Sequence, residues 1–200
     1  GKKIKLSRPQ QLMAAEREII EEAYAGDIIG VFDPGIFSIG DTLCAPGKKF
    51  KFDPIPTFAP EHFRRVRPLD TMKRKQFLKG MEQIAQEGAI QIFKTPYTGM
   101  EEVIVGVVGT LQFDVLEYRL KNEYNVDLYM EGLPYEYLRW IENDTGEPLK
   151  EDDLILGTDV KLVEDYKGNQ LLLFASQWSI NWVQEKNKNL TMSEFGGARD

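Results

Sequence analysis

The sequence contains one cysteine, Cys44, and one histidine, His62. A disulfide needs two cysteines, and a zinc site or a cysteine–histidine nucleophile needs several such side chains at suitable spacing. Neither condition is met, so we expect no disulfide, zinc site or thiol catalysis. The sequence therefore offers no candidate metal ligand and no candidate catalytic residue.

Long apolar segments are also missing. The longest apolar run, residues 103–108, is far shorter than the roughly 20 residues that cross a bilayer, and the N-terminal residues lack the apolar core of a secretion signal. We therefore expect no membrane contact and a location in the reducing cytoplasm. The sequence begins with Gly1 inside a strand-like pattern, which favours a longer protein that starts upstream.

Positive charge is scarce outside one segment. The chain has 25 basic and 32 acidic side chains and a net charge of −7, which argues against nonspecific coating of nucleic acid. Residues 61–80 reverse this balance with seven basic and two acidic side chains. Such a segment is either a solvated surface or a contact for phosphate groups. Its main cations are Arg64, Arg65, Arg67, Lys73, Arg74 and Lys75.

No phosphate-binding loop is recognisable. Residues 35–42 keep the glycine spacing of G-x-x-x-x-G-K-[ST], but Asp41 stands where a lysine must reach the phosphates. Because a carboxylate repels phosphate and no helix is predicted to follow, we interpret this segment as a barrel turn. No residue of this chain is a candidate for binding a nucleotide cofactor.

Residues 1–56 have the pattern of part of a small β-barrel. Short runs separated by glycine and proline predict strands at residues 3–6, 18–24, 27–32 and 37–43. So short a segment buries a marginal core and leaves sheet edges open, so we expect further strands to complete the barrel. Pro54, Pro56 and Pro60 indicate the boundary to a second domain at residues 57–200.

The second domain alternates strands with helices, so the chain as a whole belongs to the α+β class. The pattern predicts strands at residues 58–67, 89–93, 103–108 and 126–130, and helices at 71–87 and 111–124. Asp70 or Thr71 would cap the first helix and Thr110 the second. This order is the ferredoxin-like βαββαβ arrangement, with two helices on one face of an antiparallel sheet. We expect Leu111, Val115, Leu116, Leu120 and Tyr124 on the apolar side of the second helix.

After Gly132 the pattern predicts a C-terminal extension made of a strand, a hairpin and a helix. The strand spans residues 137–142, the hairpin strands 159–164 and 170–174, and the helix starts at Ser176. Because Trp178, Trp182 and Val183 recur at helical spacing, we expect this helix to pack on the sheet through them.

Several long stretches resemble known families. AGDIIGV at residues 25–31 and IGDTLC at 39–44 resemble the barrel domain of translational GTPases such as elongation factor G. PTFAPEHFRRVR at 56–67, FLKGM at 77–81, EGAIQIF at 87–93, VGVVGTLQFDV at 105–115 and RLKNEYNV at 119–126 resemble the release factor 3 family. The likeness runs from about residue 7 to residue 195.

This resemblance implies a barrel domain and a following α+β domain, both preceded by an N-terminal GTPase domain. It implies a parent GTPase that uses GTP/GDP with Mg²⁺, while no position of this chain matches the family's nucleotide-binding residues, so the chain itself is not expected to be an enzyme. The implied partners are the ribosome, with its RNA and proteins, class I release factors and the chain's own GTPase domain. The implied role is to promote dissociation of class I release factors during termination. We expect the cations between Arg64 and Lys75 to contact ribosomal RNA or the class I factor.

Two alternatives belong to other functional classes. Tyr135, Tyr137 and Arg139 would share one strand face and could stack bases in a stand-alone RNA-binding module. A carboxylate-based hydrolase would use the acidic loops around Asp144 and Asp152–Asp153. This requires two carboxylates held in a pocket, whereas the neighbouring glycine and proline predict an exposed turn.

Overall fold

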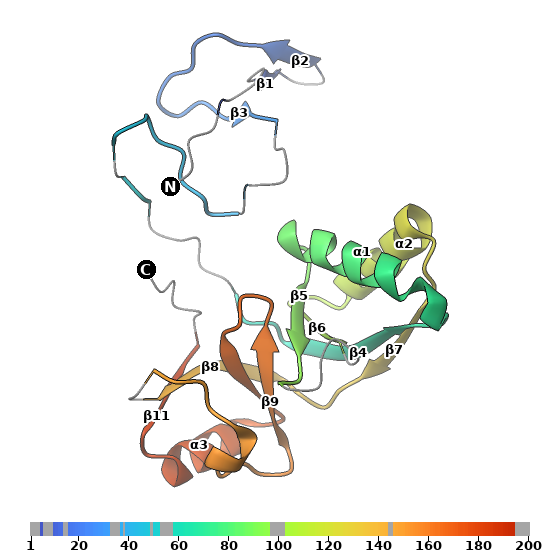
Figure 1. The fold of residues 1–200 in the computed structure, drawn as a ribbon, viewed down its shortest axis with the longest axis vertical. Coiled ribbons are helices and arrows are strands. Elements are labelled where there is room, and N and C mark those ends of the chain that lie inside the picture. The colour runs from blue at the N-terminus through green and yellow to red at the C-terminus, as the bar shows by residue number, and fades with distance from the viewer. Residues whose placement is uncertain are drawn as a thin grey trace. The chain divides into compact units, whose positions relative to one another are not determined.

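The chain divides into two compact units, Gly1–Pro54 and Ile55–Asp200 (Figure 1). The computed structural model describes residues 5, 10–13, 16–32, 37, 39–48, 50–52, 58–96, 103–143 and 146–194.

The first unit contains a small antiparallel sheet. Its strands are β1 (Gln10–Met13), β2 (Glu16–Ile19) and β3 (Ile29–Gly30), in the order β2-β1-β3. β2 and β3 overlap the strands expected at 18–24 and 27–32, and the sheet fits part of a barrel. The described residues between 37 and 43 are not in a strand, contrary to expectation, and of the strand expected at 3–6 only Lys5 is described.

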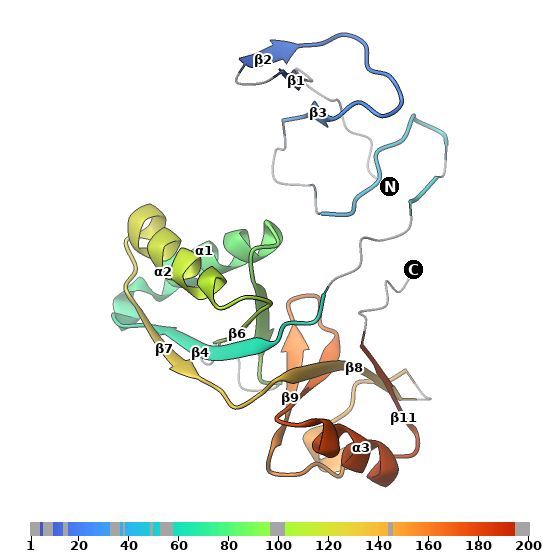
Figure 2. The same ribbon diagram turned by 180° about the vertical axis from the view of Figure 1, so that it is seen from behind.

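The second unit begins with the expected βαββαβ order. The elements are β4 (His62–Pro68), a 3₁₀ turn η1 (Thr71–Lys73), α1 (Arg74–Gln86), β5 (Gln91–Lys94), β6 (Val103–Val107), α2 (Leu111–Tyr124) and β7 (Leu128–Gly132). The strands pair antiparallel in the spatial order β5-β6-β4-β7. This is the strand order of a ferredoxin-like fold, and α1 and α2 lie together on one face of these strands (Figure 2). The predicted fold class is confirmed.

The helix ends use different caps. Asp70 caps η1 by accepting a hydrogen bond from Met72 N at 2.9 Å, as predicted. The prediction for Thr110 is wrong, because its side chain makes no capping bond. Gln112 Oε1 instead accepts from Val108 N and Gly109 N, both at 3.0 Å.

The C-terminal extension continues the same sheet. It contains β8 (Tyr137–Asn143), η2 (Glu151–Asp153), β9 (Val160–Asp165), β10 (Gln170–Phe174), α3 (Gln177–Lys186) and β11 (Leu190–Ser193). The full order of this eight-stranded sheet is β11-β8-β10-β9-β5-β6-β4-β7. The hairpin and the helix that starts after Ser176 match the prediction, whereas β11 was not predicted.

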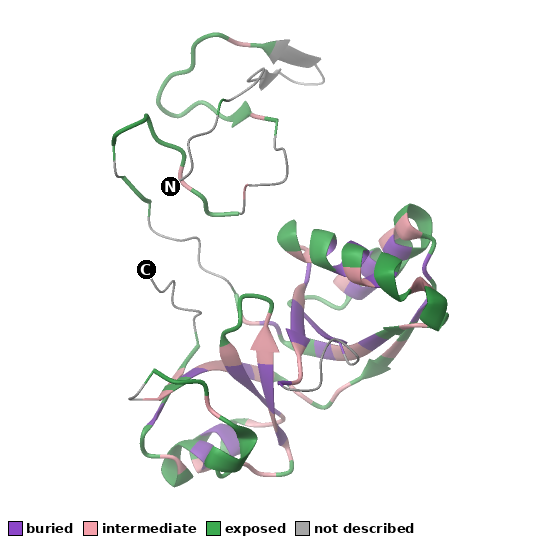
Figure 3. Ribbon diagram, in the orientation of Figure 1, coloured by how far each residue is buried: buried purple, intermediate pink, exposed green. Residues whose placement is uncertain are grey.

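Three apolar cores stabilise the second unit. Figure 3 shows that its buried residues lie on the strands and on the helices. The helix-face core lies between α1, α2 and the ferredoxin-like strands, and the α3 core lies under α3. On the sheet face away from α1 and α2, side chains from both halves of the single sheet meet in a third core, which we call the junction core. Its members are Phe63, Phe93, Ile104, Leu138, Val163, Leu171 and Leu173. Because this core joins both halves, the extension is an integral part of the domain.

The predicted packing faces of two helices are confirmed in part. On α3, Val183 is buried and Trp182 packs against the α3 core, as predicted, and Ile180 is buried beside them. The ring of Trp178, however, is 67% exposed and stacks on Trp182, with centroids 6.4 Å apart. On α2, Leu111 and Val115 are exposed. Packing therefore uses a narrower apolar face of each helix than the composition suggests.

Candidate functional site

The three arginines of β4 lie on two faces of the sheet. Side chains alternate along a strand, so Arg64 shares the helix-covered face with Val66, whereas Arg65 and Arg67 share the opposite face with Phe63. The predicted cationic segment is therefore not one continuous patch. Each of its arginines contacts different residues.

Arg64 lies above an aromatic ring of α2. Its guanidinium carbon is 4.3 Å from the centroid of the Phe113 ring, within the range of a cation–π contact. Arg64 also lines a groove of about 910 Å³ together with His62, Tyr135 and Arg139. In this groove Arg139 donates to Glu194 Oε1 at 2.6 Å, so its charge is already paired.

Arg65 and Arg67 meet partners on the edge strand β7. The register places Arg65 opposite Glu131 and Arg67 opposite Tyr129. Arg65 Nη1 donates to Glu131 Oε2 at 2.8 Å, and the Arg67 guanidinium lies 4.5 Å from the Tyr129 ring centroid. The cation–π contact holds the exposed Arg67 side chain against the sheet without neutralising its charge. Arg67 therefore remains able to bind an anion.

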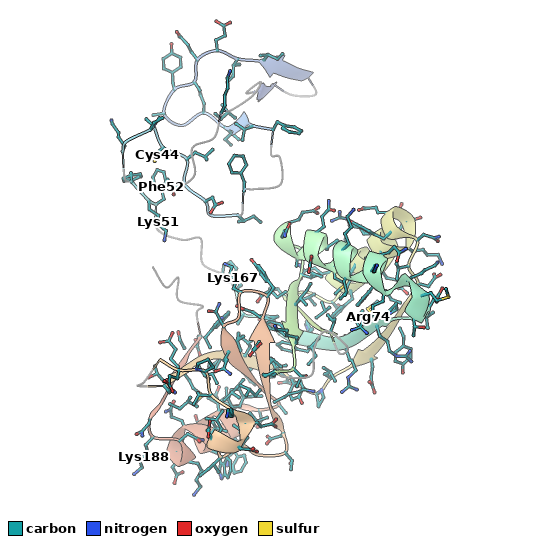
Figure 4. The ribbon with its side chains drawn as sticks, in the orientation of Figure 1. Cys44, Lys51, Phe52, Arg74, Lys167 and Lys188 are labelled. Carbon is teal, nitrogen blue, oxygen red and sulfur yellow. The ribbon has the colours of Figure 1, made fainter. Side chains whose placement is uncertain are left out.

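The remaining cations gather where α1 begins. Lys73 Nζ donates to the carbonyl oxygen of Asn125 at 2.6 Å. Arg74, labelled in Figure 4, and Lys75 are exposed in the first helical turn. This turn contains no acidic residue. The helix macrodipole already makes this end positive, so cations here cost about 0.3–1 kcal/mol each and favour an anionic partner. Of the predicted residues, Arg74 and Lys75 are the two that lie exposed in the first turn of α1.

The two aromatic partners, Phe113 and Tyr129, were missed by sequence reasoning. Both depend on tertiary pairing, one across the helix layer and one across the strand register. A tyrosine two residues before Glu131 carried no local signal for this role.

The layout proposed for base stacking is not observed. Tyr135 packs against the junction core, with its ring centroid 6.5 Å from that of Phe63. Tyr137 packs against the α3 core. Burial raises the pKa of the Tyr135 hydroxyl. The two rings therefore do not form one stacking platform.

In its described part, the glycine-spaced segment at residues 35–42 does not fit the phosphates of a nucleoside triphosphate. Asp41 occupies the lysine position of the glycine-spaced segment, and the described residues that follow it, 42–48, contain no helix whose N-terminus could receive phosphate.

The acidic loops lack the geometry of a hydrolase in the part that is described. Asp153 Oδ2 accepts from the backbone nitrogen of Lys150 at 3.1 Å, which is a local turn contact, and Asp144 lies outside the described residues. Within the described ranges, no three histidine, cysteine, aspartate or glutamate side chains come together as a possible metal site. No helix there is both long and apolar enough to span a bilayer.

Comparison with known families and proteins gives consistent matches. Residues 52–184 match the family model described as "Class II release factor RF3, C-terminal domain", and residues 1–46 match "Elongation factor G domain 2".

Similar curated proteins include peptide chain release factor 3 of Symbiobacterium thermophilum, 49% identical over 199 residues, which is 100% of this chain and 37% of that protein. The proteins of the same name from Gloeobacter violaceus and Listeria welshimeri are 43% and 42% identical over 195 residues, covering 98% of this chain and 36% of theirs. The chain therefore spans 36–37% of the length of these relatives.

Proposed function

The chain belongs to the release factor 3 family and contains its C-terminal domain, and from this premise we propose that it docks a termination factor onto the ribosome. In the longer protein, an N-terminal GTPase domain binds GTP or GDP with Mg²⁺, and the GTP cycle promotes dissociation of class I release factors in the cytoplasm. In this proposal the two units act as the docking body for ribosomal RNA and ribosomal proteins, and the catalytic residues belong to the GTPase domain.

The observation that supports a docking surface is the positive end of α1. Arg74 and Lys75 are exposed in a helical turn without acidic residues, in a chain whose net charge is −7. Cations at this end of the helix oppose the macrodipole, and an anionic partner would offset that cost. Ribosomal RNA presents a dense array of such anions as phosphates. Arg67 adds a further cation on β4.

The test compares two pairs of charge reversals in binding to purified ribosomes. The variant Arg74→Glu/Lys75→Glu changes the net charge by the same amount as Lys167→Glu/Lys188→Glu. In Figure 4, Lys167 and Lys188 lie on the extension, away from Arg74. We expect the first variant to bind at least about tenfold more weakly, with a log–log salt slope shallower by about one for each lost phosphate contact. We expect the second variant to bind like the unmodified chain.

Equal binding and equal salt slopes of the two variants would remove the α1 surface from the proposal. Equal weakening of both would indicate that net charge, rather than this surface, governs binding.

A further inference from the structure

Helix α2 carries an apolar stripe that no core of the domain covers. Val108, Leu111, Val115 and Tyr118 are each between 46% and 71% exposed. The spacing of the last three places them on one side of the helix, and Val108 precedes its first turn. We call these four residues the α2 stripe.

The α2 stripe is separate from the face that stabilises the fold. Phe113, Leu116 and Leu120 point into the helix-face core and are almost completely buried. The stripe therefore adds apolar surface that folding does not require. Neighbouring exposed apolar side chains over successive helical turns are typical of protein-binding surfaces.

The charges beside the stripe identify the chemistry of its partner. Asp114 and Glu117 are exposed next to it on α2. The nearby Lys121 is shared with a third carboxylate, since its Nζ is 3.0 Å from Asp127 Oδ1, so these four side chains together keep a negative charge. Carboxylates in this position repel RNA phosphates and anionic lipid headgroups. A second copy of the chain would bring the same carboxylates face to face. A basic protein segment with apolar side chains satisfies both the charge and the apolar surface.

We infer that the α2 stripe binds a lysine- or arginine-rich, amphipathic segment of a ribosomal protein. This inference rests on the proposed ribosome docking and assigns a second kind of contact to the same domain. The positive end of α1 meets RNA, and the stripe with its acidic border meets protein. The domain thus distinguishes the two components of one particle by the opposite charge of two surfaces, one at the start of α1 and one along α2.

Charge reversal on α2 tests the sign of the partner. In binding to purified ribosomes, Asp114→Lys/Glu117→Lys should bind about tenfold more weakly, because it opposes a basic segment. The control Glu82→Lys/Glu185→Lys reverses two exposed carboxylates on α1 and α3 and should not weaken binding. Tighter binding of the α2 variant than of the control would show that the surface contacts RNA. Unchanged binding would show that the surface makes no contact with the ribosome. Either result would overturn the inference.

Apolar contact is tested with Val115→Ser/Tyr118→Ser, which should weaken binding about tenfold while its thermal unfolding stays within the range of the unmodified chain. Both side chains are exposed, so a folding defect is not expected. Unchanged affinity would remove the stripe from the interface.

Photo-crosslinking identifies the occupant directly. A photoreactive amino acid in place of Leu111 or Tyr118 should attach to a ribosomal-protein peptide of net positive charge when the chain is bound to ribosomes. Attachment to RNA, to an acidic peptide or to the chain itself, or no attachment at all, would overturn the inference while leaving the docking proposal intact. Failure of the unmodified chain to bind ribosomes would remove both.

Discussion

The two units differ in what covers their apolar side chains. Between residues 58 and 194 three cores bury most large apolar residues. In the first unit none of the residues with described burial is buried, and Ile28 and Phe52 are 84% and 66% exposed. The stability of the second unit therefore comes from its own core, whereas the first depends on other surfaces to cover its apolar side chains. The second unit, which carries the proposed contacts, is thus the unit stabilised by its own apolar core.

The largest effect on stability should come from a substitution in the junction core. Phe93→Ala removes a ring that is 1% exposed and joins both halves of the sheet, so we expect a loss of about 3–5 kcal/mol in the free energy of unfolding. Denaturant unfolding followed by tryptophan fluorescence measures this change, since Trp140 packs against the same core. A loss below about 1 kcal/mol would contradict the view that this core unites the second unit.

A smaller loss is expected at Gly106 on β6. A Cβ at this position would lie 2.7 Å from Pro60 Cγ and 2.9 Å from Phe93 Cε2, so Gly106→Ala should cost about 1–3 kcal/mol. The matched control is Gly109→Ala, where a Cβ meets no atom within 4 Å. Equal stabilities of the two variants in thermal unfolding would show that the packing around Pro60 is looser than described.

The ion pairs of Arg119, one to Glu87 at the end of α1 and one to Glu123 within α2, should contribute less. Arg119 bonds to Glu87 and Glu123, and because these pairs are partly exposed we expect Arg119→Met to cost below about 1 kcal/mol. The hydrogen bond from Arg119 lowers the pKa of Glu123. A carboxyl group with a lowered folded-state pKa stabilises above its unfolded pKa of about 4.3, and this contribution is lost as the pH falls through the folded value.

The unfolding free energies of the unmodified chain and Arg119→Met should therefore converge below about pH 4. An undiminished difference at acid pH would mean that the variant loses packing rather than charge pairing.

The smallest effect is expected in the first unit. Phe52→Ser removes an exposed ring, so the main unfolding transition, which reports the second unit, should change by less than about 0.5 kcal/mol. A shift comparable with that of Phe93→Ala would break the comparison between the units. Such a result would mean that the two units unfold as one.

The sequence predicted most of the second unit because its elements have strong local patterns. The bounds of α2 and β10 agree with prediction, and the βαββαβ order follows from alternating periodicities. β11 was missed because Leu190–Ser193 is short and exists by pairing with the distant β8. Trp178 was misplaced because Ile180 and Val183 already fill the space under α3.

Charge counting proposed the six cations of the candidate site but could not predict how they are arranged. Counting charges located all six cations, yet the face on which each arginine of β4 lies depends on strand register. Arg64 and Arg67 therefore received one common prediction, although the first contacts Phe113 and the second Tyr129. Periodicity alone also assigned Leu111 to the core, because it cannot distinguish a face that folding buries from a face left for a partner.

Site-directed hydroxyl-radical cleavage tests the docking orientation most directly. Because Cys44 is the chain's only cysteine, a Cys44→Ser background accepts an iron chelate at one chosen position, either Gln76→Cys beside the α1 surface or Asn189→Cys beyond α3. On purified ribosomes, we predict ribosomal RNA cleavage from position 76 and much weaker cleavage from position 189. Equal cleavage from both positions, or cleavage from position 189 alone, would contradict the account.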